Sequence, residues 1–160
     1  TIDSPALLES CDAALEAGVI LVAAAGNERL SINIVTFPAA YESVIAVAAT
    51  TQYDTMYVQS SQGEEVDIAA PGVSILSTVP DGGYNFMSGT SMAAAHVTGT
   101  LALRISDDLL TGGMGDLEYY RNLLYITAED IGALPIDAGY GLVDAAKLVT
   151  GEAMGDNLPL

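Results

Sequence analysis

The sequence predicts an α/β layered fold built on a mostly parallel sheet. Two continuous apolar runs, "VILVAAAGN" (19–27) and "SVIAVAAT" (43–50), lack the alternation of a half-exposed strand and are typical of strands that are buried on both faces. Segments with helical spacing lie before and after these runs. Buried strands mixed with helices indicate helices packed on a parallel sheet.

The N-terminal segment predicts a helix that begins at Pro5. Ser4 is a residue type that caps helix N-termini, Pro5 suits the first helical position, and Gly18 ends the pattern. Three side chains fall on one helical face: Leu8, Cys11 and Leu15. Cys11 is therefore expected in the core. It is the only cysteine, so the chain can form neither an internal disulfide nor a cysteine-based zinc cluster.

The middle of the chain predicts two shorter strands, at 66–72 and 73–80, separated by a Pro-Gly pair. The stretch "PDGGY" (80–84) has the residues of a hairpin turn. Three further helices are expected at about 90–105, 116–125 and 143–149. We expect residues 1–150 to form one domain and residues 151–160 to form a C-terminal tail.

The charge of the chain excludes some partners. The 160 residues carry 21 acidic and 4 basic side chains, a formal net charge of −17. Nucleic-acid phosphates and anionic membrane surfaces require basic patches, so neither is an expected partner. The charge is explained either by solubility or by a salty medium whose ions screen the self-repulsion. No apolar run reaches the ~18 residues that span a bilayer.

Two polar residues stand where an α/β fold places its ligands. Asn27 ends the apolar run 19–27, and Ser91 lies at the start of the helix expected at 90–105. Ser91 is either a helix cap or a nucleophile at a position where the helix dipole favours a developing oxyanion. Asn27 is either a turn residue or a side-chain amide that donates to such an oxyanion.

The only histidine, His96, is not expected to act as the base for Ser91. Five residues along a helix separate two side chains by about 140° and about 7.5 Å, whereas a general base must lie within hydrogen-bond reach. Lys147, the only lysine, falls in the last predicted helix. The chain taken alone therefore contains no Ser-His-Asp triad.

Five segments, in order, resemble those of the subtilisin-like serine proteases, the subtilases. The segment "GTSMAAAHVTGTLAL" (89–103) is similar to the family's nucleophile segment, usually G-T-S-M-A-x-P-H-V-A-G, and "VILVAAAGNE" (19–28) to the strand that carries its oxyanion asparagine. The other three are "FPAAYESVIAVAAT", "VDIAAPGVSILST" and "GYGLVDAAKLV". The resemblance covers nearly the whole chain and implies a subtilisin-like three-layer fold.

The resemblance implies roles for individual residues. Ser91 looks like the nucleophile, and Asn27 like the oxyanion-hole side chain, assisted by the Ser91 backbone N–H, with Thr90 as a weaker candidate for a further contact. The substrate pocket would be lined by Ala24, Ala25 and Gly26 on one wall and by Thr36 near its base.

The resemblance also implies a cation site made of backbone carbonyls and one carboxylate. The ligands would come from Ala39, Tyr41, Val44 and Asp67. Oxygen ligands suit a hard cation, here a structural Ca²⁺ or a monovalent ion. The alternative is a solvated loop that holds no cation. The chemistry itself is expected to need no cofactor.

The chain departs from the family at two points. Ala95 replaces the usual proline after the nucleophile, which relaxes the first turns of the helix. The family's catalytic Asp and His lie in its N-terminal half, whereas this chain resembles only the C-terminal half. We therefore expect the N-terminal part, which would carry the Asp and His, to be a separate companion chain, a cleaved segment or a missing part of the gene.

The predicted function is a serine endopeptidase that cleaves polypeptides through a Ser91 acyl-enzyme and is inactive alone. Secretion is implied by the family only. Three alternatives remain. The chain could be a catalytically inactive remnant that serves as a binding or scaffold module. An α/β-hydrolase esterase is the second, but that class expects G-x-S-x-G, and Ala93 stands where the second glycine belongs. A transpeptidase or peptide ligase that uses the same site is the third, and Ala95 is the only hint of it.

Overall fold

The centre of the fold is a parallel sheet, which confirms the predicted fold class. The computed structural model of the chain describes residues 3–151. In sheet order, the strands are β1 (Leu21–Ala24), β2 (Val44–Thr50) and β3 (Ile68–Pro71). All three run parallel, with Leu21 opposite Val44 and Val47 opposite Ile68. Every residue of β2 is buried, as expected of a strand with a neighbour on each side.

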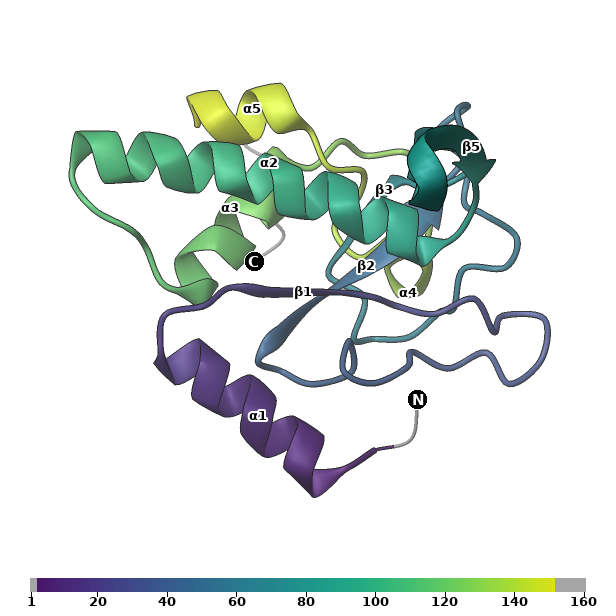
Figure 1. Cartoon of the computed structure of the whole chain (residues 1–160), viewed down its shortest axis with the longest axis horizontal. Helices are drawn as coiled ribbons and strands as arrows, with labels where there is room; N and C mark the ends of the chain where they lie inside the picture. The colour runs from purple at the N-terminus through teal and green to yellow at the C-terminus, as the bar shows by residue number, and fades with distance from the viewer. Residues whose placement is uncertain (1–2, 152–160) are drawn as a thin grey trace.

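Helices and loops cover both faces of this sheet and give three layers (Figure 1). The helices are α1 (Pro5–Glu16), α2 (Thr90–Thr111), α3 (Leu117–Thr127), α4 (Pro135–Ala138) and α5 (Ala145–Thr150). Ile45 and Val47 of β2 share a core with α2, α3 and α5, whereas Ala46 and Ala48 face the opposite side, toward α4. Alternate residues of one strand thus supply both hydrophobic cores.

Helix α1 packs on the sheet near β1 (Figure 1). Cys11 is buried there against Tyr41 and Val44, as predicted from its helical face. Ser4 precedes the helix as expected, but its hydroxyl makes no cap bond. Instead the Ser4 backbone N–H donates to the Tyr41 hydroxyl at 3.2 Å, because the Tyr41 side chain lies next to the N-terminus of α1. Leu8, on the same predicted face, is exposed.

A β-hairpin leads into the longest helix. Strands β4 (Ile75–Val79) and β5 (Gly83–Met87) pair antiparallel across the short helix η1 (Pro80–Gly82), as the "PDGGY" turn predicts. Helix α2 then begins at Thr90 and runs to Thr111, six residues beyond the predicted end. Asp108, within this extra length, forms an ion pair of 2.7 Å with Arg104 one turn earlier. Gly112 then ends the helix.

Two smaller differences concern the burial of one strand and an additional helix. The strand β1 is half-buried rather than fully buried, because within residues 3–151 it pairs on one side only. The helix α4 was not predicted. The expected tail, apart from Gly151, lies outside the described residues. Among those residues, no helix combines the length and apolar character that crossing a bilayer demands.

Candidate active site

The two candidate catalytic residues meet at the carboxyl edge of the parallel sheet. Asn27 follows β1, and Ser91 is the second residue of α2. The N-terminus of α2 is held against the end of β3 because the Gly89 N–H donates to the Gly72 carbonyl at 2.8 Å. A side chain at Gly72 would lie 2.8 Å from the Gly89 carbonyl oxygen, so this approach requires a glycine. The topology therefore brings together residues that are far apart in sequence.

Asn27 caps the helix that carries Ser91. Its side-chain oxygen Oδ1 accepts hydrogen bonds from the Thr90 backbone N–H at 3.0 Å and from the Thr90 hydroxyl at 3.3 Å. The Thr90 hydroxyl in turn accepts from the Gly26 N–H at 3.2 Å. Thr90 is fully buried. The Thr90 hydroxyl already donates its proton to Asn27 Oδ1, and this does not support its expected role as a further oxyanion donor.

This cap fixes which end of the Asn27 amide is free. A backbone N–H can bond only to the carbonyl end, so Nδ2 is the end left to donate. The Ser91 backbone N–H has no hydrogen-bond partner within the described part of the chain. Asn27 and Ser91 are both exposed. Two N–H donors thus lie at the N-terminus of a 22-residue helix, where the helix dipole favours negative charge.

Neither His96 nor Lys147 is placed to activate Ser91. His96 is exposed on α2, and its Nδ1 donates to the Met92 carbonyl oxygen at 2.9 Å, one turn back along the helix. Lys147 Nζ forms an ion pair of 2.9 Å with Asp144 at the start of α5. In residues 3–151, the Ser91 hydroxyl has no hydrogen-bonded side chain that would act as a base.

The structure brings together the four residues expected to line the substrate pocket. The Thr36 N–H donates to the Ala25 carbonyl at 2.8 Å. A Cβ placed on Gly26 would lie 3.0 Å from the Thr36 methyl group. Ala24 and Gly26 are half-buried, whereas the Ala25 side chain is fully buried in the core. Ala25 therefore presents only its backbone to this region.

Sequence reasoning missed Ser61, which supports the same turn. Its hydroxyl accepts from the Glu28 N–H at 3.1 Å, and its own N–H donates to the Gly26 carbonyl at 2.8 Å. A serine in the polar stretch "VQSSQG" carries no sequence signal for this role. Its hydroxyl oxygen lies 3.0 Å from where a Gly26 side chain would begin, so it helps to make glycine necessary there.

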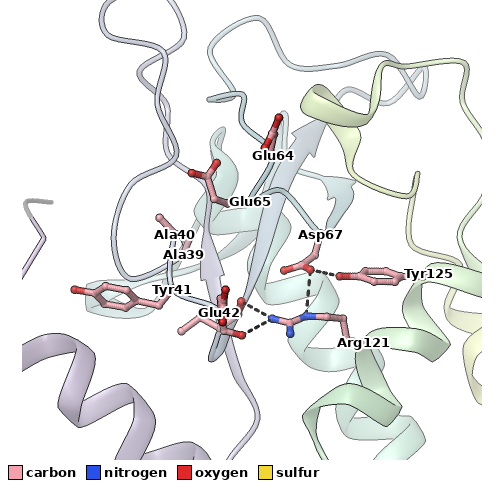
Figure 2. Close-up of a pocket in the computed structure, with 10 residues that line it drawn as sticks. Ala39, Ala40, Tyr41, Glu42, Glu64, Glu65, Asp67, Arg121 and Tyr125 are labelled. Atoms are coloured by element: carbon pink, nitrogen blue, oxygen red, sulfur yellow. Dashed lines mark hydrogen bonds and ion pairs between the residues drawn. The ribbon is translucent and has the colours of Figure 1, made fainter.

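The four residues of the expected cation site also lie together. They line one pocket of about 440 Å³ at the start of β2. Figure 2 shows that the Arg121 guanidinium, from α3, lies among them. Arg121 donates to the Val44 carbonyl oxygen at 3.0 Å, and its Nε lies 3.2 Å from Oδ1 of Asp67. Tyr125 donates its hydroxyl to the same carboxylate oxygen.

Burial dominates the electrostatics of this pocket. It raises the pKa of the Asp67 carboxyl, although the Tyr125 hydroxyl, the Ala46 N–H and the Arg121 charge all oppose the rise. Burial, together with the neighbouring Asp67, also raises the pKa of Tyr125 far above its usual range. The Tyr125 hydroxyl therefore stays protonated and remains a donor.

Comparisons with known proteins agree with these observations. The model of the subtilase family (peptidase S8) matches residues 2–142. The "Thermophilic serine proteinase" of Bacillus sp. (strain AK1) is 42% identical over 133 residues, which cover 83% of this chain and 31% of that protein. The "Halolysin-like extracellular serine protease Nep" of Natrialba magadii is 41% identical over 133 residues, or 83% of this chain and 24% of that protein.

"Subtilisin E" of Bacillus subtilis (strain 168) is 47% identical over 105 residues, which cover 64% of this chain and 28% of that protein. The chain thus spans between about a quarter and a third of the length of these three relatives. Because the family model matches most of the sequence, and the parallel sheet and the Asn27–Ser91 pair occur in the order the resemblance implies, the chain belongs to the subtilase family.

Proposed function

We propose that this chain supplies the nucleophile and the oxyanion-binding groups of a serine endopeptidase. One observation carries the proposal. The Asn27 amide is anchored through Oδ1 to the N-terminus of α2, so its Nδ2 and the Ser91 N–H are the free donors beside an exposed serine hydroxyl. Donors of this kind stabilise a developing oxyanion in acyl transfer.

In the proposed reaction, Ser91 Oγ attacks the carbonyl carbon of a peptide bond in a polypeptide substrate. Its proton passes to a histidine that this chain does not contain, and that histidine then gives the proton to the leaving amine. Asn27 Nδ2 and the Ser91 N–H hold the oxyanion, and loss of one such donor costs about 3–4 kcal/mol of transition-state stabilisation. Water then hydrolyses the acyl-enzyme and releases Ser91.

The base and its aspartate would come from residues outside these 160. The sequence has a single histidine, and His96 donates to the Met92 carbonyl. The outer edge of β1 offers a place for the remaining residues to dock. This half-buried strand pairs only with β2 in the described chain, and a further strand would cover its free edge.

A second candidate is a non-catalytic binding module that keeps the fold. The absence of a base hydrogen-bonded to Ser91 within residues 3–151 favours it.

We also propose an extracellular location for the whole protein, because one relative is named as an extracellular protease.

The test is labelling with a fluorophosphonate probe, read by intact mass. The 160-residue chain should form an adduct only negligibly, because a serine hydroxyl without a base is a weak nucleophile. A longer form of the protein that also carries the Asp and His should be labelled rapidly at Ser91. Ser91→Ala should abolish labelling. Ser88→Ala is the matched control, because Ser88 is an exposed neighbour whose hydroxyl only accepts from the Ser74 N–H, and it should leave labelling intact.

Rapid labelling of the 160-residue chain alone would overturn the proposal that the base comes from elsewhere. A folded longer form that contains the Asp and His and still resists the probe would favour the binding module.

A further inference from the structure

The pocket at the start of β2 already contains a positive charge. The Arg121 side chain extends from α3 toward Glu42 and lies beside Asp67 (Figure 2). Its Nη2 donates to the Glu42 carbonyl oxygen at 2.9 Å and to the Val44 carbonyl oxygen at 3.0 Å. Its Nε lies 3.2 Å from Asp67 Oδ1, and both side chains are largely buried, at 15% and 11% exposure.

The oxygens that a metal ion would need are already engaged. The Val44 carbonyl binds Arg121, and the Tyr41 carbonyl accepts from the Val44 N–H at 3.0 Å. Asp67 Oδ2 accepts from the Ala46 N–H at 2.7 Å, while Oδ1 faces Arg121 and Tyr125. Of the four expected ligands, only the Ala39 carbonyl lacks a hydrogen bond within the described residues.

A metal ion does not fit this arrangement. Calcium takes six to eight oxygen ligands, and a cation placed beside a buried guanidinium would be repelled by it. Arginine is well suited to replace an ion, because its guanidinium stays charged and offers five donors in a rigid fork. It is also covalently attached, so it cannot be lost by dilution or chelation.

We propose that the Arg121 guanidinium is the resident cation of this pocket, so the fold is stable without a metal ion here and removal of Arg121 uncovers a latent cation site. This inference rests on the contacts of Arg121 and does not depend on the proposed peptidase activity. Truncating Arg121 would free two carbonyl oxygens and a carboxylate. Together with the Ala39 and Tyr41 carbonyls, these oxygens form a ligand set for a hard cation.

The experiment compares melting temperatures of the 160-residue chain with and without Ca²⁺. Ionic strength is held constant with tetramethylammonium chloride, because a chain of net charge −17 responds to any salt. The variants are wild type, Arg121→Ala and Arg104→Ala. Arg104 is the matched control because it also binds a carboxylate, of Asp108 at 2.7 Å, and a carbonyl, of Val149 at 3.2 Å, without the cluster of expected ligands.

Wild type and Arg104→Ala should show no saturable response to Ca²⁺. Arg121→Ala should melt lower in its absence and should gain a saturable rise of roughly 5–10 °C at 100 times the Kd. Arg121→Lys, which keeps the charge but not the fork, serves if the alanine variant does not fold, and it should show a smaller gain.

Two results would overturn the proposal. One is a saturable Ca²⁺ response of wild type that Asp67→Asn abolishes, since a metal ion would then bind beside Arg121. The other is a folded Arg121→Ala chain whose melting temperature responds to Ca²⁺ no more than that of Arg104→Ala. If the alanine variant does not fold, the same result for Arg121→Lys would overturn the proposal.

Discussion

The side-chain oxygen of Asn27 lies 3.0 Å from the backbone nitrogen of Thr90, and this contact spans 63 residues of sequence. It does two things at once. It satisfies a backbone N–H that the first turn of α2 would otherwise leave unpaired. It also turns the amide so that Nδ2 is free beside Ser91. The stability of the helix and the orientation of the proposed oxyanion donor therefore depend on the same side chain.

Substitutions at Asn27 should separate these two roles. Asn27→Ala removes both the cap and the donor, and we expect a loss of about 1 kcal/mol in the free energy of unfolding. Asn27→Asp keeps an oxygen that accepts from the Thr90 N–H, and its charge suits the helix N-terminus, so the stability should be retained. The measurement is chemical denaturation of both variants.

In a longer, active form of the protein, both variants should lose kcat. Asn27→Ala should lose about 10²–10³-fold because it lacks the Nδ2 donor, and Asn27→Asp should lose at least as much because its carboxylate would also repel the oxyanion. An Asn27→Asp enzyme with wild-type kcat would contradict the role of Nδ2. An unchanged stability of the alanine variant would contradict the role of Oδ1.

The Thr90 hydroxyl should matter more than its methyl group. Thr90→Val leaves the Gly26 N–H, which faces the fully buried Thr90 side chain, without its 3.2 Å acceptor, and an unsatisfied group of this kind costs about 1–3 kcal/mol. Thr90→Ser keeps the hydroxyl and should cost only about 1 kcal/mol for the buried methyl. Urea unfolding of the pair tests the order. If valine proves more stable than serine, packing rather than hydrogen bonding holds the turn.

Gly26 should not tolerate a side chain. Its φ of +116° lies in a region that other residues rarely adopt, and a Cβ would lie 3.0 Å from the Ser61 hydroxyl. We expect Gly26→Ala to cost about 1–3 kcal/mol. Gly99→Ala is the control. Gly99 is an exposed residue inside α2 with no atom within 4 Å of an added Cβ, so alanine there should stabilise by about 0.5–1 kcal/mol. Equal effects at both positions would contradict this interpretation of Gly26.

Much of the fold could be predicted because apolar runs without alternating polar residues indicate strands that are buried on both faces. The run 43–50 lacks alternation, and the strand β2 is buried throughout. Parallel strands place their carboxyl ends at one edge, so the proximity of Asn27 and Ser91 followed from the order of elements. The strand β1 was expected to be equally buried, but burial depends on neighbours, and the described chain supplies only one.

The parts that could not be predicted depend on tertiary contacts between distant residues. Arg121 and Val44 are 77 positions apart, and their bond depends on how α3 packs against the sheet. The bond from the Gly26 N–H to the Thr90 hydroxyl and the bond from the Glu28 N–H to the Ser61 hydroxyl also join residues that are distant in sequence. No periodicity or motif in the sequence encodes such contacts. The sequence therefore predicts which residues gather at a site more readily than which of their atoms bind one another.

The Asp67 carboxyl should make the stability of the chain depend on pH in a defined direction. Burial raises the pKa of Asp67 in the folded state above the value of about 3.9 that an aspartate has when unfolded. Between these two pKa values the folded state binds the proton more readily than the unfolded state. The contribution of Asp67 to the free energy of unfolding is therefore largest below about pH 4 and falls as the pH rises through the folded pKa.

The comparison of wild type with Asp67→Asn isolates this effect, because the two proteins differ only at Asp67. The free energy of unfolding of wild type minus that of Asp67→Asn should decrease from pH 4 upward. A difference for Asp67→Asn that instead grows with pH would mean that attraction to Arg121 outweighs the burial of the carboxylate. The direction of this slope thus measures which of the two dominates in the pocket.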